Sequence, residues 1–366
     1  MLVESVASLA FRNLEDATTG LAPGLTIVHG ANGAGKTNLL EALYFSLTGR
    51  SCRTRAERET ITFGEPLARA TALLGPGPSG GERMSMIASV SRAEGRARRV
   101  DGRPARPDDD RRRPAISVFM PDRLALVKGP PAGRRAHLDR VVAALWPTRA
   151  EARIAYGQTL AQRNAMLGRV RSGAPPDSLD AWDRELAKRA APLIETRAEG
   201  AAALAKPFAL AAERLGLDGA ASLSYRPRVR DPDPEAVLAE LGERRASDLA
   251  RGFTGFGPHL DEVAIERHDR ALRRYGSQGQ QRLGLLALLF AERALLHDAR
   301  RRPPVLLLDD VMSELDPDRR ERLLDALVDG GQVLITVTEP QHAPLADHAA
   351  RLIEIESGRV VGVEER

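Results

Sequence analysis

The sequence predicts an α/β head domain that is interrupted by a helical arm. Three observations carry this prediction: a glycine-rich octet after an apolar run near the start, a second apolar run that ends in two aspartates near the end, and helical periodicity from about residue 134 to 215. The two outer segments, 1–120 and 250–366, are therefore expected to form one discontinuous head, with the arm inserted at 121–249.

The glycine-rich octet at residues 30–37 fits G-x-x-x-x-G-K-[ST], between a strand-like run at 25–28 and a helix-like run at 38–43. Glycines let several backbone N–H groups point at one anion, and a helix N-terminus favours negative charge. The motif indicates a nucleoside triphosphate, with Lys36 reaching the β- and γ-phosphates and the Thr37 hydroxyl holding Mg²⁺. A plain glycine-rich turn with a solvated lysine is the alternative. The residues expected to contact ATP are Gly30, Ala31, Asn32, Gly33, Ala34, Gly35, Lys36, Thr37 and Asn38.

The rest of the first α/β segment alternates strands and turns. We expect strands at about 3–11, 25–29 and 84–91, and a loop at the glycine- and proline-rich stretch 75–81. Residues 95–113 are dense in arginine, proline and aspartate, and we interpret them as an exposed, solvated loop in preference to a DNA contact.

The central segment has a helical period. Leu138, Val141, Val142 and Leu145 follow i, i+3, i+4, i+7 spacing in a helix that Pro147 ends. After a turn at 173–176, a second helix is expected with Ser178 as its N-cap, and a further short helix at about 236–245.

The second α/β segment begins after about residue 252. We expect strands at 263–267, 272–275, 305–308 and 333–338, a long helix at 278–299, and a hairpin whose strands at 352–356 and 359–363 flank Ser357-Gly358.

Two acids follow the fully apolar run 305–308, which is typical of a central parallel strand. Because ligands bind beyond the carboxyl ends of such strands, Asp309 is expected to hold Mg²⁺ beside Thr37. Asp310 is the candidate that orients or deprotonates the attacking water, so Lys36 and Asp310 are the predicted catalytic pair. A strand that simply ends in turn-forming acids is the alternative.

A helix start at Ser277-Gln278-Gly279-Gln280 has the spacing S-x-G-Q, the core of the ABC signature, which is S-G-G-Q in transporters. It lies 27 residues before Pro304, in the expected order, and Ser277 is a good N-cap. In ABC-type ATPases the signature touches the γ-phosphate bound by a partner subunit, so we expect an ATP-dependent homodimer. A capped helix with no further role is the alternative. The stretch 311–316 resembles the D-loop of that class, and its expected D-loop residues are Glu314, Leu315 and Asp316.

Together these residues resemble the RecF family of bacterial DNA replication and repair proteins. The matching motifs are Phe11-Arg12-Asn13, residues 30–42, Gly49-Arg50-Ser51, Arg53-Thr54, Phe119-Met120-Pro121, residues 124–131, Arg134-Arg135, Leu138-Asp139, Gly257-Pro258-His259, residues 277–282, 306–316 and 336–339. Departures stand at Asp122-Arg123, at Leu260, where the family has arginine, and at Gly276, where many members have a larger residue.

The resemblance implies an ABC-type P-loop ATPase head, related to SMC heads, with weak, slow ATP hydrolysis. It implies an ATP-dependent dimer that binds single- and double-stranded DNA, with preference for gap junctions. It also implies work with RecO and RecR in recombinase loading, and a link to the SOS response. Candidate DNA contacts are Lys128, Arg134 and Arg135, near a Gly-Pro-Pro turn.

The composition fits this interpretation without demanding it. A net charge of +4 permits a nucleic-acid partner. The single cysteine, Cys52, and an N-terminus without a signal peptide predict a cytoplasmic protein with no membrane segment, since the longest apolar stretch, 283–290, is too short to span a bilayer.

Two other nucleotide-binding classes fit the motifs less well. A transporter ATPase subunit would carry a histidine where this chain has Thr338-Glu339, and the next histidine is His342. A GTPase would need an N-K-x-D motif, which the sequence lacks, and the octet alone does not exclude a P-loop kinase.

Overall fold

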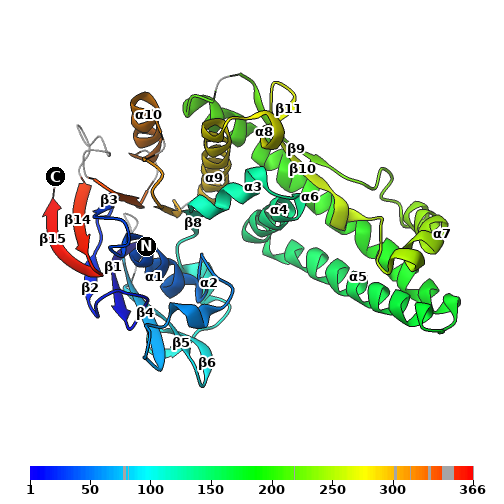
Figure 1. Cartoon of the computed structure of the whole chain (residues 1–366), viewed down its shortest axis with the longest axis horizontal. Helices are drawn as coiled ribbons and strands as arrows, with labels where there is room; N and C mark the ends of the chain where they lie inside the picture. Colours follow the sequence, from blue (N-terminus) through cyan, green and yellow to red (C-terminus); the bar gives the residue numbers. More distant parts are fainter. Residues whose placement is uncertain are drawn as a thin grey trace. The chain divides into compact units, whose positions relative to one another are not determined.

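The computed structural model describes residues 1–76, 80, 82–217, 219–300, 303–313, 315–328, 331–339 and 350–365. The chain divides into two compact units, Met1–Asp122 with Leu296–Arg366, and Arg123–Leu295 (Figure 1). No helix among the described residues is both long and apolar enough to cross a membrane.

The first unit contains a six-stranded sheet in the order β15-β14-β3-β13-β12-β8. All neighbours are parallel except β15, which forms an antiparallel hairpin with β14. Its strands are β3 (Leu25–His29), β8 (Ile116–Phe119), β12 (Val305–Leu308), β13 (Val333–Val337), β14 (Ala350–Glu356) and β15 (Arg359–Glu365). The expected strands at 25–29, 305–308 and 333–338 and the C-terminal hairpin are confirmed, because apolar runs of this length belong in a sheet covered on both faces.

A second sheet of the same unit is antiparallel, in the order β2-β1-β4-β5-β6-β7. Its strands are β1 (Leu2–Leu9), β2 (Thr18–Gly20), β4 (Leu67–Gly75), β5 (Met84–Ser91), β6 (Gly95–Val100) and β7 (Arg103–Pro104). The predicted strands at 3–11 and 84–91 correspond to β1 and β5. Residues 77–79 and 81 of the predicted loop lie outside the described residues.

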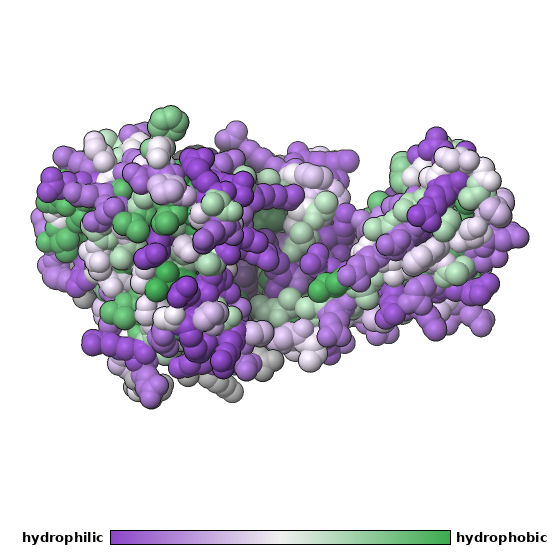
Figure 2. Space-filling view, turned by 90° about the horizontal axis from the view of Figure 1, so that it is seen from below, coloured by the Kyte–Doolittle hydropathy of each residue, from purple (hydrophilic) through white to green (hydrophobic). Residues whose placement is uncertain are grey.

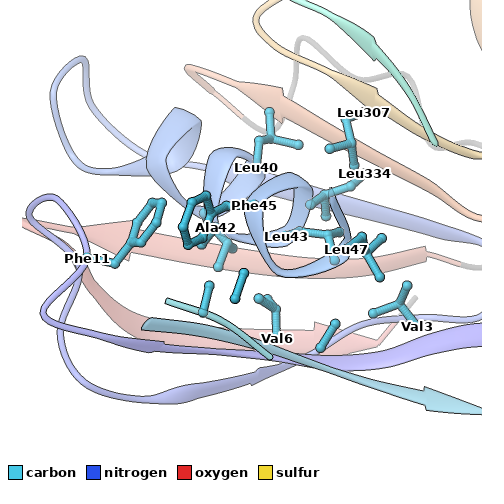
Figure 3. Packing of buried hydrophobic residues seen from close by; sticks show 14 of the residues in the cluster. Val3, Val6, Phe11, Leu40, Ala42, Leu43, Phe45, Leu47, Leu307 and Leu334 are labelled. Carbon is cyan, nitrogen blue, oxygen red and sulfur yellow. The ribbon is translucent and has the colours of Figure 1, made fainter. Parts of the chain in front are cut away.

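Helix α1 (Lys36–Thr48) packs against both sheets and forms the centre of the hydrophobic core. Figure 3 shows its side chains Leu40, Leu43 and Leu47 between strands of the two sheets, with Phe45 beside Phe11. Most residues of the helix are buried, as expected of a helix enclosed in a core. Further helices of this unit are η1 (Glu57–Thr60), α2 (Asp109–Arg112) and α10 (Pro317–Val328).

The expected exposed loop at 95–113 is wrong, because this stretch contains β6, β7 and α2. Strand β6 pairs with β5 from Ser91↔Gly95 to Met86↔Val100. The alternation in Arg96-Ala97-Arg98-Arg99-Val100 suits a strand, since arginine stems cover apolar surface while their charged ends stay in water. Because this stretch is so rich in charged residues, its sequence did not indicate the strand β6.

The second unit is mainly helical. Its elements are the end of η2 (Pro121–Leu124), α3 (Ala125–Lys128), α4 (Pro131–Leu145), η3 (Pro147–Arg149), α5 (Ala150–Arg171), η4 (Pro176–Leu179), α6 (Asp180–Arg214), β9 (Ala221–Arg226), α7 (Pro234–Arg251), η5 (Pro258–Leu260), β10 (Glu262–Arg267), β11 (Arg270–Ala271), α8 (Leu272–Tyr275) and most of α9 (Gln278–Arg300). The three strands form a small sheet in the order β11-β10-β9.

The second boundary between the units differs from the expected one, since residues 250–295 group with the arm segment. The reason is strand pairing. Strand β10 is antiparallel to β9, from Glu262↔Arg226 to Arg267↔Ala221, and so extends the arm's own sheet. A short strand in the sequence does not reveal which sheet it will join.

Two local predictions in this unit are wrong. Residues 272–275 form helix α8 in place of a strand, with the Leu272 carbonyl accepting hydrogen bonds from Gly276 N and from Gln281 Nε2. Helix α6 has Leu179 as its N-cap without a side-chain bond, because Ser178 lies inside the preceding turn η4.

A buried ionic cluster joins three helices of the arm. Arg163 of α5 is fully buried and contacts Asp183 of α6 at 2.6 Å and Asp248 of α7 at 2.8 Å. Both carboxylates are fully buried as well. The cluster fixes the relative position of the helices because every buried charge needs its partner.

We expect Arg163→Ala to destabilise the protein by about 3–5 kcal/mol, because it removes the fully buried cation shared by Asp183 and Asp248 and leaves each carboxylate with a more exposed arginine, Arg245 or Arg251. Urea unfolding measures the change. Arg189→Ala is the matched control, since Arg189 is half exposed and pairs with Glu185 one turn away, and it should cost at most about 0.5 kcal/mol. Equal stability of the two variants would contradict the role of the cluster.

Candidate nucleotide-binding site

Three adjacent strands end at the candidate site. The glycine-rich octet follows β3, the two aspartates follow β12, and Thr336 lies near the end of β13, which separates β3 from β12. The strands are parallel, so their carboxyl ends share one edge of the sheet. Residues that are far apart in sequence meet at this edge, where open α/β sheets bind ligands.

The Asp309 carboxylate accepts hydrogen bonds from two threonines. The Thr37 hydroxyl lies 2.8 Å from Oδ1 and 3.0 Å from Oδ2, and the Thr336 hydroxyl donates to Oδ1 at 2.8 Å. Burial raises the pKa of Asp309, and the two hydroxyl bonds oppose that rise. The predicted Thr37–Asp309 pair is therefore brought together.

Asp310 has a left-handed backbone, with φ of 47°, which is uncommon for residues other than glycine. Its N–H donates to Thr336 Oγ1 at 2.9 Å. Its Oδ1 is buried without a hydrogen-bond partner among the described residues. The turn thus holds a second carboxylate beside Asp309 with one oxygen left to accept.

These oxygen groups fit a magnesium ion, which prefers carboxylate, hydroxyl and water oxygens. Thr37 and Asp309 would hold it, and the unpartnered oxygen of Asp310 is suited to accept a proton or hydrogen bond from a water beside it. The donor set matches the ion predicted from the sequence.

The Lys36 ammonium donates to the carbonyl oxygens of Gly30 at 2.7 Å and Ala31 at 3.0 Å. Burial lowers its pKa, while the charges of Asp310 and Asp309 oppose this. The lysine is thus held over the loop at the start of α1, where phosphate oxygens can replace carbonyls as its partners.

The loop itself suits an anion. Gly30 and Gly35 have φ of 147° and 114°, and a Cβ on Gly30 would lie 2.2 Å from the Ile355 carbonyl oxygen. The first turn of α1 has no acidic residue and its N-cap makes no side-chain bond. A helix N-terminus of this kind offers N–H groups and partial positive charge to phosphate.

A polar network supports the loop from the side. Asn13 Nδ2 donates to the Gly33 carbonyl at 3.3 Å and its Oδ1 accepts from Asn38 at 2.6 Å, while Arg53 donates to Asn38 Oδ1 at 2.8 Å. The fully buried Glu41 carboxylate accepts hydrogen bonds from both Nε and Nη2 of Arg12, each at 2.9 Å.

Sequence reasoning assigned a site role to Gly33 and Asn38 but none to their supporting partners Arg12, Asn13, Glu41 and Arg53. Glu41 carried the signal, because an acid among Leu39, Leu40, Ala42 and Leu43 must be buried and needs cationic partners. Arg12 and Arg53 supply them.

The C-terminal hairpin also contacts the loop. Gly358, in the turn between β14 and β15, donates its N–H to the Ala34 carbonyl at 2.6 Å and accepts from Glu15 N at 2.9 Å. It has φ of 88°, and a Cβ there would lie 1.8 Å from the Asn13 carbonyl oxygen. Only glycine fits this approach without moving the backbone.

The predicted signature lies in the second unit, at the start of α9. Ser277 Oγ accepts from Gln280 N at 3.3 Å and Ser277 N donates to Gln280 Oε1 at 2.9 Å, which forms a capping box and confirms the predicted N-cap. Ser277 and Gln278 are exposed and Gly279 is partly exposed. Gly276 is required by packing, since a Cβ there would lie 2.8 Å from the Leu272 carbonyl oxygen.

Of the expected D-loop, Glu314 lies outside the described residues, as does His342. Leu315 is buried. Asp316 caps α10, with Oδ1 accepting from Arg319 N at 2.9 Å.

The candidate DNA contacts differ in their surroundings. Arg134 is buried, pairs with Glu262 at 2.7 Å and donates to the Gly129 carbonyl at 2.8 Å, so its guanidinium is engaged within the second unit. Arg135 is partly buried and donates to the Asp261 carbonyl at 2.6 Å. Lys128 is exposed at the end of α3.

The fold and the site together define a P-loop ATPase head of the ABC type with an inserted helical arm. A family model described as "AAA domain" matches residues 9–79. The chain is 37% identical to the DNA replication and repair protein RecF of Heliobacterium modesticaldum, with 92% of each chain covered. The chain belongs to the RecF family.

Solved structures agree with this assignment. A structure described as the recombination mediator protein RecF-ATP in the RecFOR pathway superimposes with a TM-score of 0.85, at 25% identity, over 100% of this chain and 97% of that one. An SmcHead bound to the C-winged helix domain of ScpA gives a TM-score of 0.60 at 16% identity, over 100% of this chain and 98% of that one, and shares the fold.

We expect Gly358→Ala to weaken nucleotide binding roughly tenfold or more, because backbone strain of about 1–3 kcal/mol would be relieved by moving Ala34 or Asn13. Titration with a fluorescent ATP analogue measures the affinity, and circular dichroism checks folding. Gly24→Ala is the control, since a Cβ there meets nothing within 4 Å. Unchanged affinity in a folded Gly358→Ala protein would rule out a supporting role for the turn.

Proposed function

We propose that this chain is an ATP-dependent DNA-binding protein of replication and recombinational repair. The observation that carries the proposal is the hydrogen bond between Thr37 and Asp309, which joins the phosphate loop to the acidic end of β12. Membership of the RecF family supplies the DNA-repair context.

In the proposed mechanism the chain's own groups divide the chemistry. The loop N–H groups and Lys36 bind the phosphates of ATP, and Thr37 and Asp309 hold Mg²⁺. Magnesium, when bound, neutralises charge that develops on the transferred phosphoryl group. Asp310 orients the attacking water and accepts its proton through the buried oxygen that has no partner among the described side chains.

The signature completes the site from a second copy of the chain. The exposed start of α9, at Ser277, Gln278, Gly279 and Gln280, would bind the γ-phosphate held by the partner, as its N-terminal N–H groups favour an anion. Two ATP molecules then close the dimer, and slow hydrolysis opens it.

The closed dimer would hold DNA, with preference for junctions between single- and double-stranded segments at gaps. It would act in the cytoplasm with RecO and RecR in loading recombinase, and in the SOS response. The related structure described as RecF-ATP in the RecFOR pathway supports this context. Backbone phosphate contacts should dominate, so binding should weaken as salt rises.

The deciding experiment compares this protein with its Lys36→Ala variant on fluorescent duplex, single-stranded and gapped DNA, with and without ATP and Mg²⁺. The wild-type protein should bind gapped DNA at least about tenfold more tightly with ATP, and the variant should lose that gain because no phosphate ligand replaces Lys36. Binding that ignores ATP would contradict the proposal.

Ser277→Arg tests the dimer. The variant should bind ATP as the wild type does but remain monomeric. The bulky arginine side chain at the start of α9 would prevent the close approach of the γ-phosphate held by the partner. Sedimentation velocity with ATP and Mg²⁺ measures the association state. Arg184→Ala, on the arm, is the control, and a normal ATP-dependent dimer of Ser277→Arg would overturn the signature assignment.

A further inference from the structure

A cavity of about 670 Å³ lies in the first unit at the far end of α1 from the phosphate loop. Its walls come from the end of α1, strand β6 and the region of α2, elements labelled in Figure 1. The lining residues at this end of α1, Tyr44, Thr48 and Gly49, lie about 12–20 Å from Lys36 along the helix axis. The cavity is therefore separate from the nucleotide site.

Arginine dominates the lining. Arg50, Arg96, Arg98 and Arg113 face the cavity, against one acid, Asp110. Arg98 and Arg113 share the Asp110 carboxylate at 2.8 and 3.0 Å. One carboxylate cannot neutralise two guanidinium groups, so the walls keep an excess of positive charge. Hydrophilic residues also cover much of the molecular face drawn in Figure 2.

The remaining lining arginines are more accessible. Arg50 is exposed, and the side chain of Arg96 is 48% exposed, with a bond to Glu57 at the rim at 2.7 Å. Positive charge from Arg113 also reaches Arg300 nearby, where it adds to burial in lowering the pKa. The Arg300 Nη1 atom is buried without a partner among the described residues.

The surrounding segment concentrates the charge of the whole chain. Residues 50–113 contain fifteen arginines and nine acidic residues, an excess of six positive charges in a chain whose net charge is +4. The remainder of the chain is therefore slightly acidic. A polyanion attracted to this protein would meet its positive field here.

The end of α1 is prepared for an anion as well. A helix C-terminus carries partial negative charge that repels anions. Arg98 Nη2 donates to the Leu47 carbonyl at 3.3 Å, and so places a cation at that end. A phosphate can then approach the arginines without facing bare carbonyl oxygens.

We propose that this cavity binds backbone phosphates of DNA. Planar guanidinium groups match phosphate oxygens in pairs, and the lining offers one aromatic ring, Tyr44, so backbone contacts fit better than base stacking. The inference rests on the proposed DNA-binding function and assigns to it a surface outside the arm.

The test compares two double variants with the wild type on the same fluorescent gapped duplex, with ATP and Mg²⁺, over a series of salt concentrations. Arg50→Ala with Arg96→Ala removes the two accessible lining arginines. Arg92→Ala with Arg99→Ala removes the same amount of charge from the β5–β6 hairpin, to which Arg96 belongs, and neither residue lines the cavity. Thermal unfolding and ATP hydrolysis without DNA confirm that each variant is intact.

The cavity variant should bind DNA roughly tenfold or more weakly, and the slope of log K against log salt should fall by about 2, because two phosphates are no longer neutralised by arginine. The matched control should remain near the wild type. Equal losses of affinity in both variants would mean a general effect of net charge and would overturn the proposal.

Two further outcomes distinguish a failure of the cavity proposal from a failure of the proposed ATP-dependent DNA binding. A wild-type protein that binds DNA together with a cavity variant that binds equally well would overturn the cavity alone and would favour an acidic protein as its occupant. A wild-type protein that binds no DNA with ATP would overturn both.

Discussion

The structure of the site depends on the hydrogen bonds of one buried carboxylate. Asp309 accepts hydrogen bonds from Thr336, near the end of the neighbouring strand β13, and from Thr37, in the helix after β3, which is the next strand beyond β13. Residues 272 positions apart are joined in this way. The parallel order β3-β13-β12 makes the bonds possible, because it brings three carboxyl ends to one edge of the sheet. A buried acid without these donors would be costly, so the sheet and the site stabilise each other.

Much of this edge could be predicted from the sequence, since long apolar strands, glycines at a phosphate loop and acids at a strand end have distinct local signals. The network around Glu41 could not be placed, because its partners Arg12 and Arg53 come from loops whose approach depends on the folded sheet. The strand β6 and the helix α8 were mispredicted for a related reason. Charged or short segments take their structure from neighbours, as β6 does from β5.

The arm shows why a basic residue cannot be assigned to DNA from its sequence context alone. Arg134 follows a Gly-Pro-Pro turn and looks accessible in the sequence, yet it is buried and tied to Glu262. Arg197 is likewise buried between Asp139 and Asp261. Arginine satisfies several acceptors at once, so a helical arm with few aromatic residues uses it to lock its helices together. The guanidinium groups of these two arginines are paired with buried or partly buried carboxylates, and they stabilise the fold.

The two ends of α1 carry opposite partial charges, so an anion is attracted to the N-terminus and repelled by the C-terminus. At the N-terminus, an uncapped first turn without acids leaves N–H groups for phosphate, and Lys36 adds a cation. At the C-terminus the helix dipole would repel phosphate, and Arg98 offsets it by binding the Leu47 carbonyl. One buried helix can therefore carry an anion site at each end. The N-terminal site uses backbone N–H groups and Lys36, whereas the C-terminal site uses arginine side chains. That difference explains why the first site is visible as a sequence motif, whereas the second emerges only when β6 and α1 are folded together.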